Sequence, residues 1–125
     1  MKEIKFRAWH KDRKSMCDVI ELSFKRKEVT LALETEEGEY YWDETEHNFD
    51  DVELMQYTGR KDSEGKGIYE GDILQNEHHF KYQVVFKGDC WRCEPIKNNY
   101  FKNRFIGNDL KVIGNVYKNQ ELLED

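Results

Sequence analysis

The sequence contains few residues of the kinds that mark secreted or membrane proteins. Proline occurs once, at Pro95, and there are only three cysteines, Cys17, Cys90 and Cys93. An odd cysteine count does not suit the disulfide framework of a small secreted domain. No apolar run approaches the roughly 18–20 residues of a membrane helix, and residues 1–6 lack the apolar block of a signal peptide. We therefore expect a cytosolic protein that makes no contact with a membrane.

The high content of charged residues does not indicate disorder. Charged residues make up 37% of the 125 residues, but aromatic residues make up 14%, and disordered chains are poor in aromatics. A chain of this length can bury a modest core, either as one domain or as two small subdomains that share it. We expect a folded protein with a heavily charged surface.

Basic residues are missing from one part of the chain altogether. Residues 34–53 hold ten acidic residues and no Lys or Arg, whereas residues 1–33 hold nine basic residues against five acidic ones. The net charge of −6 is thus unevenly spread, which disfavours uniform binding to a polyanion. Four residues of the acidic segment form a candidate interaction site, the acidic patch: Glu36, Glu37, Asp43 and Glu44. This patch would attract a basic host protein or the basic N-terminal residues of a second copy, because opposite charges on one chain favour head-to-tail assembly.

The hydrophobic pattern predicts a mainly β fold. Ile4, Phe6 and Ala8 alternate with polar or exposed positions, which is typical of a half-buried strand. Residues 1–57 are predicted to form an N-terminal β-meander that includes an acidic loop at 34–51. Its strands are expected at 4–9, 16–24, 29–33 and 52–57, and the aromatic residues at 40–42 leave open a further short strand inside the loop.

The C-terminal part of the chain predicts a second subdomain of short strands. Residues 58–125 carry turn signals at regular spacing and predict an SH3-like small β-barrel, by analogy of fold alone. Its strands are expected at 68–75, 80–87, 90–94 and 110–117. At most one or two short helices are predicted, one within 98–109 and one at 120–123.

Four blocks of sequence, spread over nearly the whole chain, form an ordered series. They read KFRAW at 5–9, LMQYTG at 54–59, IYEGDIL at 68–74 and IGNVY at 113–117, the last followed by ELL at 121–123. This series resembles the YopX family of small bacteriophage and prophage proteins. The resemblance implies a phage-encoded homo-oligomer in the bacterial cytoplasm and supplies no catalytic residue. Departures from the family pattern are small: His10, Arg60 and Gln120 stand where Asp, Leu and Pro are common.

Six positions within these blocks are expected to be structural rather than catalytic: Tyr57, Gly59, Tyr69, Gly71, Asp72 and Gly114. The carboxylate of Asp72 follows a glycine and is expected to accept backbone hydrogen bonds that fix the preceding turn.

Several familiar chemistries fail on spacing. Residues 59–67 do not form a phosphate-binding loop, because the first glycine stands one residue too far from the Gly-Lys pair and Gly67 occupies the Ser or Thr position. Cys90 and Cys93 lie in strand-like sequence, where thiols three residues apart point to opposite faces. A zinc site would need further ligands from Cys17, His78 or His79, whereas His10 and His47 are interpreted as surface histidines. We predict no catalytic residue, metal or cofactor.

Basic and aromatic residues alternate near the C-terminus, which is typical of surfaces that bind single-stranded nucleic acid. This candidate nucleic-acid patch contains Lys97, Tyr100, Phe101, Lys102 and Arg104. Phe105 follows them at helix-compatible spacing, and Lys87 and Arg92 are expected nearby on the barrel. A short amphipathic helix that buries its aromatics explains the same pattern. The leading hypothesis is a non-catalytic, oligomeric protein-interaction module that acts on a host or phage protein. The alternative is a nucleic-acid-binding small β-barrel, and the third possibility is an enzyme with an unrecognised site.

Overall fold

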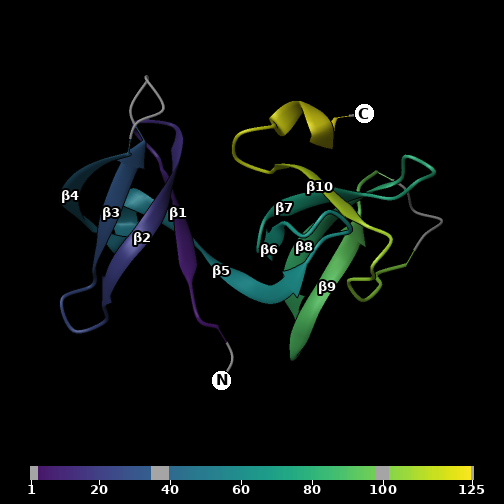
Figure 1. The fold of residues 1–125 in the computed structure, drawn as a ribbon, viewed down its shortest axis with the longest axis horizontal. Helices are drawn as coiled ribbons and strands as arrows, with labels where there is room; N and C mark the ends of the chain where they lie inside the picture. Colours follow the sequence, from purple (N-terminus) through teal and green to yellow (C-terminus); the bar gives the residue numbers. More distant parts are fainter. Residues whose placement is uncertain (1–2, 35–39, 98–101, 125) are drawn as a thin grey trace. The chain divides into compact units, whose positions relative to one another are not determined.

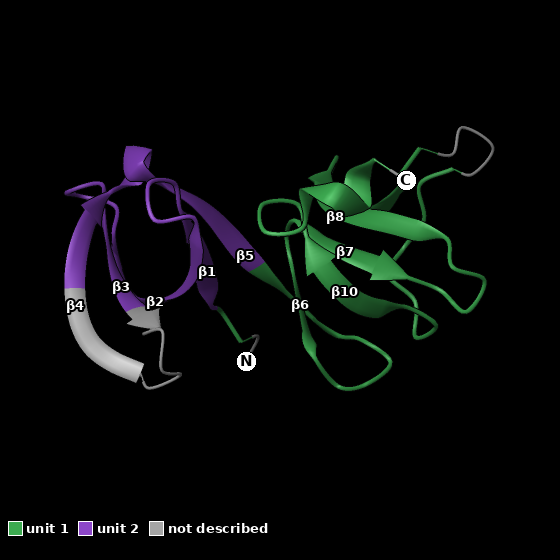
Figure 2. Ribbon diagram, turned by 90° about the horizontal axis from the view of Figure 1, so that it is seen from above, with its two compact units in different colours: residues 1–4, 57–125 green, residues 5–56 purple. Residues whose placement is uncertain are grey.

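The fold was analysed in a computed structural model that describes residues 3–34, 40–97 and 102–124, with the backbone alone at 33–34 and 40–44. The chain divides into two compact units (Figure 2), residues 5–56 and residues 57–125 with 1–4. Antiparallel strands dominate both units (Figure 1), which confirms the predicted mainly β class. Among the described residues, no helix has the length and apolar character needed to cross a membrane.

The unit 5–56 is an antiparallel meander. Its elements are β1 (Phe6–His10), β2 (Ser15–Ser23), β3 (Glu28–Glu34), β4 (Tyr40–Asn48), the 3₁₀ helix η1 (Phe49–Asp51) and the first half of β5 (Val52–Lys61). The strands follow the order β4-β3-β2-β1-β5, so the first four are neighbours both in sequence and in space. This arrangement is the predicted N-terminal meander.

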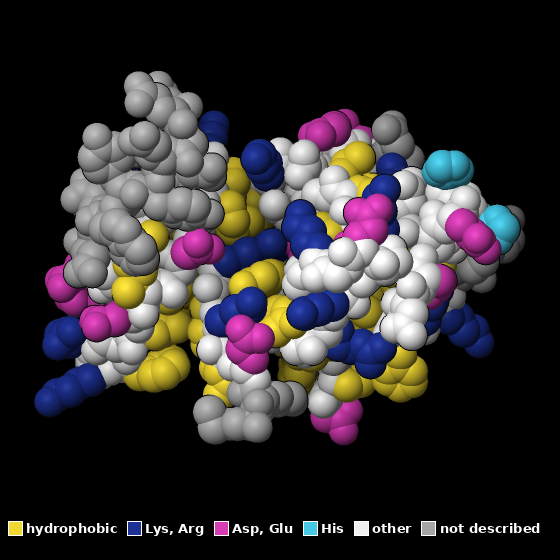
Figure 3. Space-filling model, viewed as in Figure 1, with side chains coloured by type: hydrophobic (Ala, Val, Ile, Leu, Met, Phe, Trp, Pro, Cys, Tyr) yellow, Lys and Arg dark blue, Asp and Glu magenta, His cyan; other side chains and the backbone are white. Residues whose placement is uncertain are grey.

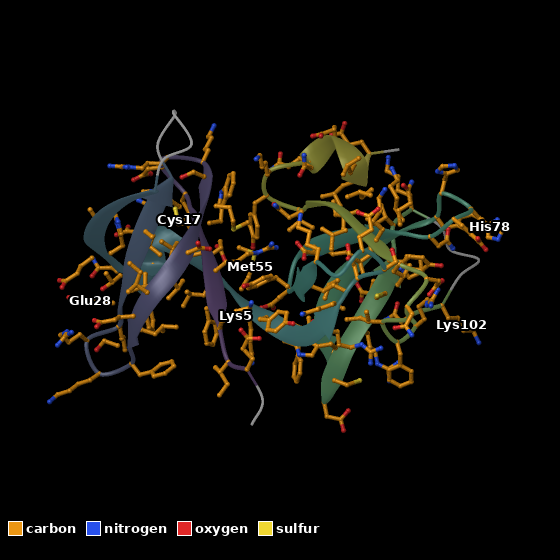
Figure 4. The ribbon with its side chains drawn as sticks, viewed as in Figure 1. Lys5, Cys17, Glu28, Met55, His78 and Lys102 are labelled. Atoms are coloured by element: carbon orange, nitrogen blue, oxygen red, sulfur yellow. The ribbon has the colours of Figure 1, made fainter. Side chains whose placement is uncertain are left out.

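Strand alternation places one set of side chains in a shared core. Ala8 lies opposite Cys17 in the β1–β2 register, and both are buried. Together with Val29, Leu31 and Val52 they form a single apolar cluster, and Figure 4 shows Cys17 on the sheet of this unit. The period-two pattern therefore predicted the burial of Ala8 correctly. Phe6 is only half-buried, and Ile4, which precedes β1, is 71% exposed.

The segment 34–51 was predicted as an acidic loop, and that prediction is wrong for most of its length. β4 pairs with β3 from Glu34↔Tyr40 to Glu28↔Asn48, and η1 follows directly. The register shifts between the pairs Leu31↔Thr45 and Leu33↔Tyr41. Between these pairs β3 advances by two residues and β4 by four, so the extra residues of β4 form a bulge. The bulge breaks the strict alternation by which a strand is recognised from sequence.

The sheet of this unit is strongly curved. The imidazole rings of His10 on β1 and His47 on β4 lie 4.7 Å apart, although β2 and β3 separate the two strands in the sheet. A flat sheet would hold strands three positions apart at a distance of about 14 Å. The backbone N–H of Phe49 donates to Lys27 O, which continues the β3–β4 ladder by one residue beyond Glu28↔Asn48. The strands β1 to β4 follow this curve in Figure 2.

The unit 57–125 contains shorter strands joined by tight turns. Its elements are the second half of β5, β6 (Gly67–Tyr69), β7 (Asp72–Gln75), β8 (Lys81–Lys87), β9 (Cys90–Pro95), β10 (Lys111–Asn115) and the 3₁₀ helix η2 (Gln120–Leu123). The sheet runs in the order β10-β7-β8-β9, and β6 pairs with β5. Its core contains Ile68, Leu74, Tyr82, Val84, Cys93, Ile106 and Leu110.

The strands and helices of this unit match the sequence expectations only in part. The single strand expected at 68–75 is two strands, because the chain turns at Gly71, whose φ of +85° suits glycine. No helix forms over 102–109, where the backbone instead bridges β9 through Arg104. The helical turn expected at 120–123 is confirmed as η2. The SH3-like barrel stays a prediction.

Candidate interaction surfaces

The six motif positions lie on β5, β6, β7, β10 and the turns beside them. Tyr57 pairs with Tyr69 between β5 and β6, and their rings lie 5.4 Å apart. Gly114 pairs with Ile73 between β10 and β7. A Cβ atom on Gly114 would stand 2.6 Å from Asn119 Oδ1, so no larger residue fits there without a shift. These contacts give the motif a structural role.

The turn between β6 and β7 depends on Gly71 and Asp72. Asp72 is almost fully buried, and its Oδ2 accepts a hydrogen bond of 2.8 Å from Tyr69 N, which confirms the bond predicted from the sequence. Gly71 N donates to Val84 O, and Gly71 O accepts from Val116 N. The turn therefore joins three strands of the unit, and its carboxylate is used in doing so.

Asp62 joins the turn after β5 to β10, and sequence reasoning did not predict this contact. It is buried, its Oδ1 accepts from Glu64 N at 2.9 Å and Lys66 N at 2.8 Å, and its Oδ2 accepts from Val112 N at 2.9 Å. Burial raises the pKa of Asp62, but the three N–H donors outweigh that effect and lower it below the usual range. The sequence could have predicted part of this contact, because Asp62 stands three residues before Gly65, a spacing typical of a turn closed by an aspartate.

The structure brings together only part of the predicted nucleic-acid patch. Tyr100 and Phe101 lie outside the described residues. Lys97 is exposed and its Nζ donates to Glu124 O. Lys102 is exposed and extends away from the sheet (Figure 4). Arg104 is held by internal contacts.

Arg104 forms a bidentate ion pair with Asp109, with N–O distances of 3.0 and 2.6 Å. The hydrogen bond from Arg104 lowers the pKa of Asp109 and raises that of Arg104. The guanidinium also lies 5.7 Å from the ring centroid of Tyr82. An arginine used in this way fixes the segment after β9 and is poorly placed to bind phosphate.

Exposed aromatic side chains lie on the β8–β9 hairpin and on the segment after it, and of these the sequence reasoning singled out Phe105 but not Phe86 or Trp91. Phe86 is 55% exposed and meets Trp91 edge-to-face at 5.0 Å. Phe105 is 66% exposed, and the guanidinium of Arg92 lies 4.9 Å from its centroid. Trp91 packs against the core cluster of this unit, whereas Phe86, opposite it on β8, does not belong to that cluster. Hydrophobic side chains next to Lys and Arg are visible on the face drawn in Figure 3.

The acidic patch divides between β4 and the residues before it. Asp43 and Glu44 belong to the bulged part of β4, which stands at the end of the sheet order. Their side chains, and residues 35–39 with Glu36 and Glu37, lie outside what the structure describes. Of the four patch residues, Asp43 and Glu44 thus belong to a strand at the sheet edge.

The cysteines and histidines do not assemble into a metal site within the described ranges. Cys93 is buried in the core, which raises its pKa to about 11, whereas Cys90 is partly exposed three residues away on the same strand. His78 is exposed on the turn before β8 (Figure 4). The interpretation of His10 as a surface residue is wrong: it is 6% exposed and its Nδ1 accepts from Arg13 N at 3.1 Å.

Comparison with known proteins decides the family. The model of the YopX protein family matches residues 5–124. The chain belongs to the YopX family. The structure is also similar to the crystal structure of protein EF1440 from Enterococcus faecalis, with a TM-score of 0.65, 25% identity and coverage of 98% of this chain and 99% of that one. No curated protein matches the chain. The resemblance of the four sequence blocks to this family is thus confirmed.

Proposed function

We propose that this YopX protein is a non-catalytic interaction protein of phage or prophage origin, which forms a homo-oligomer and binds a host or phage protein in the bacterial cytoplasm. The proposal rests on the different environments of the polar and the aromatic side chains in the unit 57–125. Polar groups that could do chemistry are used to hold turns, whereas large aromatic groups remain exposed.

The polar half of this observation rests on Asp62, Asp72 and the Arg104–Asp109 pair. Each carboxylate accepts hydrogen bonds from backbone or guanidinium donors at 2.6–3.0 Å. A general acid or base must be able to exchange a proton with a substrate. A carboxylate that several N–H donors keep charged, such as Asp62, is poorly suited to that role and well suited to stabilising a fold.

The aromatic half rests on Phe86 and Trp91. They face each other across β8 and β9 on the side of the sheet that carries Val84 and Cys93, at the end of the hairpin. We infer that this uncharged pair, called the hairpin contact, meets the same surface of a second copy. A two-fold contact places a surface against itself, so it favours apolar groups over groups of one charge.

A second partner is proposed for the acidic patch on and before β4. Ten carboxylates within residues 34–53 attract a protein with a basic surface. The position of β4 at the end of the sheet order supports this proposal, because edge strands are common places for a partner to approach.

The oligomer is tested by native mass spectrometry of the purified protein. We expect more than one copy in the wild-type complex and a loss of at least about tenfold in association for Phe86→Ser, because an aromatic residue at the centre of a contact typically contributes 2 kcal/mol or more. Phe80→Ser is the matched control, since Phe80 is 36% exposed and lies outside the hairpin contact. A monomeric wild type, or equal association of both variants, would contradict the proposal.

The partner is tested by purifying the tagged protein from infected cells. Neutralising Glu36, Glu37, Asp43 and Glu44 together should remove a stoichiometric basic partner. The control neutralises four acidic residues of the other unit, Glu64, Glu77, Asp89 and Glu121. Capture that survives the first set of changes, or is lost equally in both, would count against the acidic patch.

A further inference from the structure

The segment after Lys102 continues the sheet of the unit 57–125 by one irregular strand. Cys93 N donates to Arg104 O at 2.8 Å, and Arg104 N donates to Cys93 O at 3.1 Å. This bridge sets Arg104 beside Cys93. The next residues in register, Phe105 and Arg92, therefore fall on the opposite face from the buried thiol of Cys93.

On that face Arg92 and Phe105 form a stacked pair. The guanidinium carbon lies 4.9 Å from the ring centroid, and the Phe105 side chain remains 66% exposed. A guanidinium above an aromatic ring is held by cation–π attraction and covers only one of the two ring faces. The other face of Phe105 stays open to a planar ligand.

The charges around the stacked pair leave a local positive excess. Glu94, which lies two residues after Arg92 on β9, binds Lys87 at 2.9 Å, and Asp109 binds Arg104, the residue before Phe105. Within the described part of the chain, Arg92 and Lys102 form no ion pair. Val85, opposite Arg92 on β8, adds an apolar neighbour rather than a negative one.

We propose that Arg92, Phe105 and Lys102 form a binding site for single-stranded nucleic acid. A base stacks on the open face of Phe105, and Arg92 and Lys102 attract the adjoining phosphates. Arg92 and Phe105 lie on the face opposite the hairpin contact, so the stacked pair can be tested independently of the proposed oligomer. Arg104, which the sequence placed in the nucleic-acid patch, is not part of the site because it is paired with Asp109.

Single strands are favoured over duplexes and over acidic proteins. A duplex hides its base faces in the stack, whereas a single strand can place a base flat on an exposed ring. An acidic peptide would be attracted by the two cations but would gain little from the ring. The net charge of −6 restricts binding to this local site and makes it weak at high salt.

The test is fluorescence anisotropy of a labelled oligothymidylate at low salt. We expect saturable binding by the wild-type protein and a loss of about tenfold in affinity for Phe105→Leu, because base–ring stacking contributes on the order of 1–3 kcal/mol. Lys102→Gln should weaken binding several-fold and reduce its salt dependence. Phe105 and Lys102 are both exposed, so these changes leave the core intact.

Lys118→Gln is the matched control, because Lys118 is exposed in the same unit and its loss changes the net charge equally. Unchanged affinity in Phe105→Leu, or equal losses in Lys102→Gln and Lys118→Gln, would overturn the proposal. Competition by polyglutamate as effective as that by unlabelled oligothymidylate would also overturn it and identify an acidic protein as the ligand.

Discussion

The two units reach a β structure by different means. The unit 5–56 uses strands of five to nine residues whose alternating side chains fill one apolar cluster. The unit 57–125 uses mostly shorter strands, and its turns are tied by carboxylate and amide side chains bound to backbone N–H groups. The fold of the unit 5–56 depends chiefly on the alternation of apolar and polar residues. The fold of the unit 57–125 depends on individual residues at its turns.

This difference affects how many residue types each kind of position can accept. Alternation can be kept by many residue types, because any apolar residue of suitable size serves at a core position. A turn closed by Asp72 or bent at Gly71 accepts few substitutes, because each needs a given acceptor or a positive φ. Two of the four recognisable blocks, at 68–74 and 113–117, lie in the unit with the tied turns, whereas the block at 5–9 lies in the other unit and the block at 54–59 spans both.

The sharpest test of this comparison is Asp62→Ala. The change leaves three backbone N–H groups without their acceptor, so we expect a loss of about 2–4 kcal/mol in the free energy of unfolding. Hydrogen exchange followed by NMR should show the loss at Ile68 and Val84, while Val29 and Leu31 keep their protection. Equal loss in both units would show that the chain unfolds as one cooperative body.

The control for Asp62→Ala is Glu64→Ala, which removes an exposed carboxylate 3.7 Å from Lys111 and should cost less than about 0.5 kcal/mol. The pH dependence gives a second check. Because the pKa of Asp62 is lowered in the fold, its stabilisation is present at neutral pH and is lost as the pH falls through that lowered value. Asp62→Asn should therefore reduce the loss of stability in acid.

Sequence reasoning succeeded where structure follows from local pattern. It predicted the meander, the buried Ala8 and the hydrogen bond of Asp72, because each depends on residues that are close in sequence. It missed the bond from Val112 to Asp62, which joins residues that the fold brings together. It expected Arg92 near the patch that includes Phe105, but not the stack of the one on the other. It also interpreted the nine acidic residues of 34–51 as belonging to a loop, because a charge pattern indicates exposure and does not indicate strand pairing.

A smaller effect is expected at the turn of Gly71. Its φ of +85° is costly for a β-branched residue, so Gly71→Val should lose about 1–3 kcal/mol in the free energy of unfolding. Gly71→Asn should lose less, because asparagine tolerates positive φ. Thermal unfolding of both variants separates backbone strain from side-chain volume. Equal losses would mean that space, rather than the backbone angle, selects glycine here.

The smallest effect on stability is expected at His47, which lies in the unit 5–56. Burial and the neighbouring His10 and Arg13 lower the pKa of His47 below its ordinary value of 6.5. The unfolded chain then binds more protons than the fold between that lowered value and about pH 6.5, so stability should rise with pH across this interval. His47→Gln should remove that rise, which is below about 1 kcal/mol, whereas His78→Gln, at an exposed site, should leave it unchanged. Urea unfolding measured at several pH values makes the comparison. An unchanged pH dependence in His47→Gln would contradict this prediction. It would mean that the charge on His47, beside His10, does not affect the stability of the unit 5–56.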